Sequence, residues 1–168
     1  MHSKLLRANY FLIGLFCEGT MNYNVIRYFS QHKLSRGKDI KEFYFKHKDV
    51  GGWPGGVRIV YDDRTMSDLP NSDRVRIKKY FSVEKCLYCL DKLNRNADIS
   101  VGDNYIKKNA TEKGVSSVII RTQMGNCIWN KCRDSFHVWE DCADDLLESQ
   151  KVSRKKENYE FAQIKGLY

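Results

Sequence analysis

The chain has 168 residues, a length that suits one domain with its own hydrophobic core. Hydrophobic residues make up 42% of it and charged residues 30%, with only two prolines and 11 glycines, which argues against a low-complexity or disordered chain. The formal net charge of +8 is compatible with nucleic acid, an anionic cofactor or an acidic partner. Because the charge is scattered along the chain, we expect mainly a solvated surface and do not expect nucleic acid as a partner.

The first half of the chain predicts alternating strands and helices. An almost unbroken apolar run over 10–17 predicts an inner strand of a sheet, and Thr20 is a candidate N-cap of a helix that continues to Phe29. Alternation and turn residues then predict, in order, a strand over 42–47, a glycine-rich loop over 51–56, a strand over 57–61, a hairpin turn over 62–64, a loop over 67–73 and a helix over 74–81.

The second half contains another apolar run, over 116–122, which we also expect to be an inner strand. Residues 123–126 predict a turn, 127–129 the returning strand of a hairpin, and 135–150 an amphipathic helix. Together these elements predict an α/β fold over residues 1–168, as a single domain with a mixed central sheet and flanking helices.

The chemical role of the six cysteines depends on whether their cellular compartment is oxidising or reducing. The apolar run near the N-terminus is too short to span a bilayer and has no small-residue cleavage site after it, so we expect a cytoplasmic protein without a signal peptide or membrane span. Thiols stay reduced there, which favours core residues, metal ligands or redox groups over disulfides.

Cys86 and Cys89 form the most informative motif, because two thiols separated by two residues can hold one metal ion or cluster from a single turn. The spacing alone fits a thioredoxin-type pair, half of a zinc site, half of an iron–sulfur site or two core cysteines. Its place in mid-chain, after a polar segment, disfavours the thioredoxin type. A zinc site needs a second pair, for which Cys127 and Cys132 are candidates, although we expect these two and Cys142 to have packing roles.

The segment 97–103, with two aspartates and a glycine, follows the cysteine motif within a dozen residues. Such a segment can place backbone N–H groups near Gly102 beside a bound anion or nucleotide, and Lys107 or Lys108 can offset phosphate charge. Arg121 ends the predicted strand over 116–122, where it pairs either with a ligand phosphate or carboxylate or with an ordinary salt-bridge partner.

These motifs resemble, in order, those of the coenzyme F420 hydrogenase/dehydrogenase beta subunit family. The resemblance covers most of residues 10–125 and rests on Cys86-x-x-Cys89-x-Asp91 with the segment 97–103, on the stretch 13–19, and on 117–122 followed by Gly125. Full-length members carry a long N-terminal half with a Gly-x-Pro-Cys-type strand end and, in many members, a ferredoxin-like cysteine cluster. The chain therefore resembles the C-terminal half and lacks the N-terminal one.

The resemblance implies an iron–sulfur flavoprotein oxidoreductase that passes electrons between a 4Fe–4S cluster, FAD and a deazaflavin or another two-electron partner. Carried onto this chain, it implies that Cys17, Cys86 and Cys89 ligate the cluster, with the fourth ligand from the missing half, from Asp91 or from solvent. The implied partner is a redox protein or the N-terminal half itself. The residues that would line the flavin or cluster pocket are Asp98, Ser100, Gly102, Asp103 and Arg121.

We therefore expect an electron-transfer module of an oxidoreductase. The alternative is a zinc-binding or metal-free scaffold in polysaccharide biosynthesis, a setting in which related proteins also occur.

Overall fold

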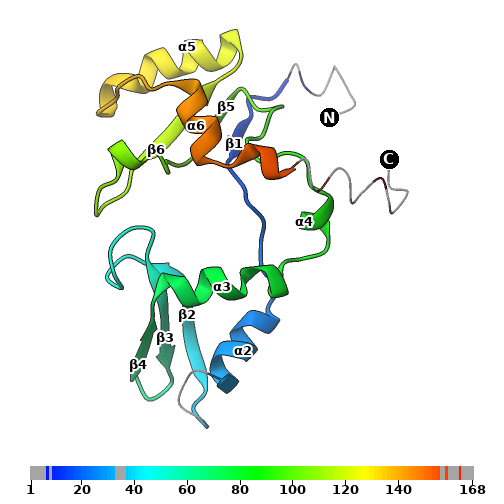
Figure 1. Ribbon diagram of the computed structural model, residues 1–168. Coiled ribbons are helices and arrows are strands. Elements are labelled where there is room, and N and C mark those ends of the chain that lie inside the picture. Colours follow the sequence, from blue (N-terminus) through cyan, green and yellow to red (C-terminus); the bar gives the residue numbers. More distant parts are fainter. Residues whose placement is uncertain (1–6, 8, 33–36, 156–157, 159–162, 164–168) are drawn as a thin grey trace. The chain divides into compact units, whose positions relative to one another are not determined.

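A computed structural model describes residues 7, 9–32, 37–155, 158 and 163, and the chain forms two compact units (Figure 1). Unit 1 comprises Met1–Glu18, Leu87–Ala110 and Val115–Tyr168, and unit 2 comprises Gly19–Cys86 and Thr111–Gly114. The chain thus leaves unit 1 after Glu18 and returns to it at Leu87. No helix in the described part of the chain is long and apolar enough to cross a membrane.

Unit 1 contains a three-stranded mixed sheet built from β1 (Ile13–Leu15), β5 (Ile99–Asp103) and β6 (Ser116–Ile120). The strand order is β1-β5-β6, with β1 parallel and β6 antiparallel to β5. The register aligns Ile13 with Ile99 and Ile120, and Leu15 with Val101 and Val118. The predicted α/β class is confirmed.

The middle strand of this sheet is β5, so the expectation that the runs over 10–17 and 116–122 are inner strands was wrong. Each apolar run contributes a strand on one side of β5. The sequence pattern missed β5 because Asp98 and Ser100 make the segment look like a polar loop. Both side chains are buried, and other groups of unit 1 satisfy them, which allows a polar sequence to occupy the centre of a sheet.

Unit 1 also contains the helices α5 (Gln123–Cys132) and α6 (Ala143–Ser149). Short 3₁₀ turns lie before, between and after them: η1 (Lys107–Asn109), η2 (Arg133–Ser135) and η3 (Val152–Arg154). The predicted turn and returning strand over 123–129 were therefore wrong. Thr122 is the N-cap of α5, and its hydroxyl oxygen accepts a hydrogen bond of 3.0 Å from the Gly125 N–H. That cap starts a helix at the point where the hairpin was expected.

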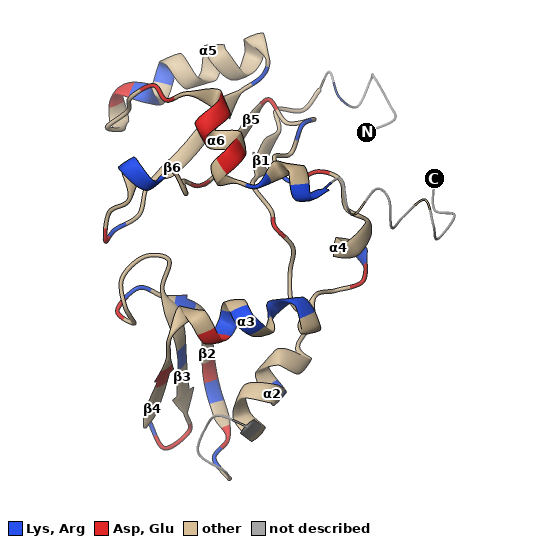
Figure 2. Ribbon diagram, viewed as in Figure 1, with Lys and Arg blue, Asp and Glu red and all other residues tan. Residues whose placement is uncertain are grey.

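The helix predicted over 135–150 is largely absent, since only Ala143–Ser149 is α-helical. The preceding Phe-His-Val-Trp stretch combines residues of low helix propensity and is exposed, with Phe136 at 58% and Trp139 at 50%. Asp144 and Asp145 lie in the first turn of α6, where negative charge favours a helix start. Figure 2 shows this acidic character of α6.

Unit 2 contains an antiparallel sheet of β2 (Ile40–His47), β3 (Gly56–Tyr61) and β4 (Met66–Leu69), with helices α2 (Asn24–His32) and α3 (Asn71–Phe81). The strands predicted over 42–47 and 57–61, the turn between β3 and β4 and the helix over 74–81 are confirmed. The loop predicted over 67–73 was wrong, because the short edge strand β4 continues to Leu69 and α3 begins at Asn71. The core of the unit consists of Val25, Phe29, Val57, Ile59, Tyr61 and Ile77.

The helix expected to start after Thr20 begins later, as α2 at Asn24. Thr20 has other partners: its carbonyl accepts a hydrogen bond of 3.1 Å from the Val83 N–H, and Met21 forms an isolated bridge with Ser82. The Asn22 side chain instead accepts from the Asn24 N–H at 3.1 Å. Unit 2 therefore holds the segment that enters it beside the segment that leaves it.

Candidate functional site

The three cysteines predicted as ligands lie next to two of the points where the chain passes between the units. Cys17 follows β1 in unit 1, Cys86 lies in the single turn α4 (Lys85–Tyr88), and Cys89 follows that turn. Cys17 and Cys89 are exposed, and Cys86 is half-buried. All three thiols are free of disulfides.

Cys86 is held by the segment that enters unit 2. The Thr20 N–H donates a hydrogen bond of 3.3 Å to the Cys86 Sγ. Gly19 has a φ of +123°, and a Cβ at this position would lie 3.4 Å from the Cys86 Sγ. Glycine is favoured here by the positive φ, since a Cβ would make only an ordinary van der Waals contact with the sulfur.

Cys17 and Cys89 make separate contacts within unit 1. The Cys17 N–H donates to the Lys92 carbonyl at 2.8 Å, and the Cys89 thiol donates to the Asp91 carbonyl at 3.2 Å. The Asp91 carboxylate accepts from the Leu93 N–H at 3.1 Å and from the Arg95 N–H at 2.9 Å, so it shapes the turn that follows the motif.

Among the side chains that the structure describes, no group of three or more His, Cys, Asp or Glu is placed to hold a metal ion. Cys17 and Cys89 belong to unit 1 and Cys86 to unit 2. The shared cluster ligation by all three therefore stays a prediction.

Asp98 is 2% exposed and anchors the segment that precedes β1. Its carboxylate accepts from the Arg7 guanidinium at 2.8 Å, from the Leu12 N–H at 2.8 Å and from the Thr122 hydroxyl at 2.6 Å. The hydrogen bond from Arg7 is the largest cause that holds the pKa of Asp98 far below its usual range, and the bonds from Thr122 and Leu12 act in the same direction. Asp98 is thus an ionised structural anchor.

Ser100 and Arg121 are brought together by a direct hydrogen bond. The Arg121 Nη1 donates to the Ser100 Oγ at 2.5 Å, and its Nη2 donates to the Leu93 carbonyl at 3.0 Å. Ser100 in turn donates to the Asn94 carbonyl at 3.1 Å. The guanidinium therefore ties β6 to the loop before β5, through a hydroxyl and a carbonyl.

Gly102 and Asp103 lie at the other end of β5. A Cβ on Gly102 would lie 2.4 Å from the Phe16 side chain, so only glycine lets this ring cross the strand. The Asp103 carbonyl accepts from the Gln150 Nε2 at 2.6 Å, and its carboxylate accepts from the Tyr105 hydroxyl at 3.2 Å. Of the five predicted cofactor residues, Ser100, Gly102 and Asp103 thus lie in β5, Asp98 directly precedes it, and Arg121 follows β6.

Sequence reasoning missed a buried lysine in this region. Lys92 is 7% exposed, its ammonium donates to the Gln150 backbone carbonyl, and its Nζ lies 3.9 Å from the Glu18 carboxylate. Lys108, which was expected to offset phosphate charge, contacts Asp141 at 2.7 Å and Asp145 at 3.2 Å. No local pattern signals Lys92, whereas Thr122 is of a residue type favoured at helix N-caps and could have indicated the start of α5.

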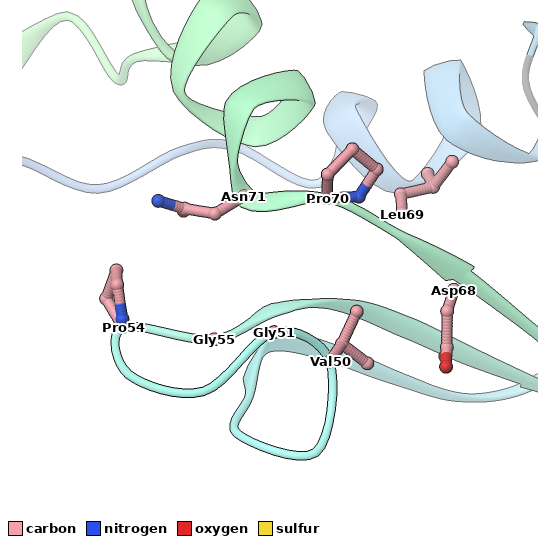
Figure 3. Close-up of a pocket in the computed structure, with 8 residues that line it drawn as sticks. All are labelled: Val50, Gly51, Pro54, Gly55, Asp68, Leu69, Pro70 and Asn71. Atoms are coloured by element: carbon pink, nitrogen blue, oxygen red, sulfur yellow. The ribbon is translucent and has the colours of Figure 1, made fainter. Parts of the chain in front are cut away.

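A separate pocket of about 410 Å³ lies in unit 2 between the glycine-rich loop and the start of α3 (Figure 3). Its acidic residue, Asp68, is bound by the Arg58 guanidinium through contacts of 2.9 and 2.8 Å, and Asn71 accepts from Arg74 at 2.5 Å. None of the predicted site residues lines this pocket. Its lining is formed by Val50, Gly51, Pro54, Gly55, Asp68, Leu69, Pro70 and Asn71.

Comparison with known proteins places this geometry in context. The chain is similar to a chain of the F420-reducing [NiFe] hydrogenase complex from Methanosarcina barkeri, with 23% sequence identity and a TM-score of 0.52. The match covers 92% of this chain and 49% of the other, so this chain spans about half the length of its structural relative. No curated protein matches the sequence. The family described as the C terminus of the coenzyme F420 hydrogenase/dehydrogenase beta subunit matches residues 1–145, and the chain belongs to this family.

Proposed function

We propose that the chain is the C-terminal module of an iron–sulfur flavoprotein oxidoreductase that passes electrons between a 4Fe–4S cluster, FAD and a deazaflavin or another two-electron partner. Family membership supports a redox module related to coenzyme F420 chemistry. The observation that carries the cluster assignment is the N–H group of Thr20 directed at the Cys86 sulfur. The proposed ligands are Cys17, Cys86 and Cys89.

Covalent connectivity supports a shared site for these cysteines. Three residue steps separate Thr20, which contacts the Cys86 Sγ at 3.3 Å, from Cys17. An extended chain spans at most about 3.6 Å per residue, so the two Cα atoms of Cys17 and Thr20 are within about 11 Å in any arrangement of the units. Cys89 follows Cys86 after one helical turn. Three soft thiolates within this reach suit an iron–sulfur cluster.

The neighbouring residues suit a negatively charged thiolate site. A backbone N–H donor, such as that of Thr20, stabilises charge on the Cys86 sulfur. Lys92 adds a buried positive charge, and its carbonyl binds the Cys17 backbone. A bound cluster supplies one-electron transfer; the chain's residues hold its sulfur ligands and set the charge around them.

For FAD, the residues present give less support. Asp98, Ser100 and Arg121 are engaged by groups of unit 1, and Asp98 and Ser100 are buried. We therefore propose that the flavin pocket is completed by the half of the fold outside this chain. A second polypeptide, or a longer form of the same one, is the corresponding redox partner.

The test is anaerobic purification followed by measurement of iron, acid-labile sulfide and visible absorption. We expect iron and sulfide in the parent protein, and loss of most iron in Cys17→Ser, Cys86→Ser and Cys89→Ser. The matched controls Cys127→Ser, Cys132→Ser and Cys142→Ser should keep it. Colourless protein with zinc or no metal would contradict the proposal and favour the scaffold alternative. Retention of iron by Cys17→Ser would remove that residue from the ligand set.

A further inference from the structure

One face of the sheet in unit 1 carries two rows of apolar side chains. The first row is Ile13, Ile99 and Ile120, and the second is Leu15, Val101 and Val118, as the strand register aligns them. Side chains two residues apart on a strand share a face, so all six project from the same side of the sheet.

Within the described part of unit 1, this face is covered around Ile99 but is open over β1 and at Val118. Ile99 is 6% exposed, and α5 packs nearby, since a Cβ on Gly125 would lie 3.3 Å from the Ile99 Cγ1. In contrast, Ile13 is 63% exposed, Leu15 is 65% exposed and Val118 is 36% exposed. We call Ile13, Leu15, Val101 and Val118 the β1 face.

The other surfaces of β1 are closed. The Asn94 Nδ2 donates to the Leu15 carbonyl at 2.6 Å, and a Cβ on Gly14 would lie 2.3 Å from the Asn94 Cβ. The loop before β5 therefore covers the outer edge of β1 and the side opposite to the β1 face. Parallel strand pairs such as β1 and β5 normally have both faces covered, which makes the open apolar face unusual.

We infer that the β1 face is the docking surface for the half of the family fold that lies outside this chain. The chain matches only 49% of its structural relative, and the family that it belongs to is the C terminus of a longer subunit. The β1 face carries no charged residue, as expected for a surface buried in a permanent interface. This inference rests on family membership and the strand register, and it holds whether or not the chain binds a cluster.

The experiment uses the full 168-residue chain, produced together with a recombinant polypeptide that spans the unmatched part of the Methanosarcina barkeri chain. We expect a one-to-one complex in which amide hydrogen exchange slows at β1. The double variant Ile13→Glu/Leu15→Glu should bind at least about tenfold more weakly, because two apolar side chains can no longer be buried. The control Val75→Glu changes a 57% exposed apolar residue of α3 and should bind normally.

The inference would be overturned if no complex formed, if the double variant formed the complex equally well, or if exchange protection were confined to elements other than β1. A parent chain that sediments as a dimer, which the double variant converts to a monomer, would assign the face to a second copy and also contradict it. Thermal unfolding of each variant shows whether it folds, and hydrogen exchange on the parent chain needs no variant. Iron content, measured in parallel, reports separately on the proposed function.

Discussion

Arg7 and Asp98 are joined by a hydrogen-bonded ion pair of 2.8 Å, although 91 residues separate them in the sequence. Asp98 also binds the Leu12 N–H and the Thr122 hydroxyl, so one carboxylate links the approach to β1, the start of β5 and the cap of α5. The aspartate expected to face a cofactor thus has a structural task that the sequence alone did not indicate.

Replacement of Asp98 by asparagine should destabilise the fold. The amide keeps the shape of the side chain, but its nitrogen cannot accept the hydrogen bonds that the second carboxylate oxygen receives. We expect the free energy of unfolding to fall by about 1–3 kcal/mol at pH 7, as for the loss of a buried hydrogen-bond acceptor. Urea unfolding measures it, with the exposed Asp134→Asn as control. An unchanged midpoint would show that the Asp98 contacts contribute no net stability.

The contribution of Asp98 should depend on pH with a defined sign. Because the pKa of Asp98 is lower in the folded protein than its ordinary value of 3.8, its stabilising effect is complete above that value and is lost as the pH falls toward the folded pKa. The difference in unfolding free energy between the parent protein and Asp98→Asn should therefore be constant from pH 7 to about pH 5 and shrink below about pH 4. Urea unfolding at pH 7, 5, 4 and 3 measures this difference; a gap that grows in acid contradicts the assignment.

Sequence patterns predicted unit 2 better than unit 1, for a physical reason. The strands of unit 2 alternate between core and solvent: Val57 and Ile59 are buried, and the partly buried Phe43 packs against them. In unit 1, the buried charge of Asp98 directly precedes the middle strand, and its partner Arg7 lies far away in the sequence. Periodicity detects apolar faces and cannot detect a polar segment that distant groups satisfy.

The candidate site was predicted only in part. The pairing of Ser100 with Arg121 follows from neighbouring strands, which a correct topology would have placed together. The contact of Gly19 and Thr20 with Cys86 depends on two segments that run beside each other over a long sequence separation. A resemblance identified these residues as important, but only the structure shows what each one touches.

Gly125 should tolerate no larger residue. A Cβ there would lie 2.6 Å from the Asp98 backbone carbonyl oxygen, in the tight contact between α5 and β5. Gly125→Ala should therefore lower the free energy of unfolding by about 1–3 kcal/mol through steric strain, although alanine favours a helix by about 1 kcal/mol. The neighbouring exposed Asn126→Ala is the matched control and should be neutral or stabilising. Thermal unfolding distinguishes them, and a stabilised Gly125→Ala would contradict the close packing.

Arg121 and Ser100 should be energetically coupled. Arg121→Met and Ser100→Ala each remove one side of a 2.5 Å hydrogen bond, so their effects on unfolding should not add. We expect a coupling energy of about 0.5–3 kcal/mol in a double-mutant cycle measured by urea unfolding. The pair Arg121→Met and Ser117→Ala, which lies farther along the sheet, provides the control cycle. Additive effects of Arg121→Met and Ser100→Ala would show that the contact contributes little to stability.

Gly19 should affect a bound cluster through the backbone. Its φ of +123° is unfavourable for alanine, so Gly19→Ala should displace the Thr20 N–H from the Cys86 sulfur. An N–H donor stabilises the more negative, reduced cluster, and its loss should lower the reduction potential and speed the loss of iron in air. A redox titration followed by electron paramagnetic resonance measures the potential.

Gly51→Ala provides the matched control for backbone strain. Gly51 also has a positive φ, +81°, but a Cβ there would meet no atom within 4 Å. Both variants should therefore lose stability through strain, and only Gly19→Ala should change the potential and the rate of iron loss. Equal effects of the two variants on the cluster would show that general destabilisation, and not the hydrogen bond to Cys86, causes the change. If Gly19→Ala kept its iron and the reduction potential did not change, the Thr20 N–H would have no influence on the cluster.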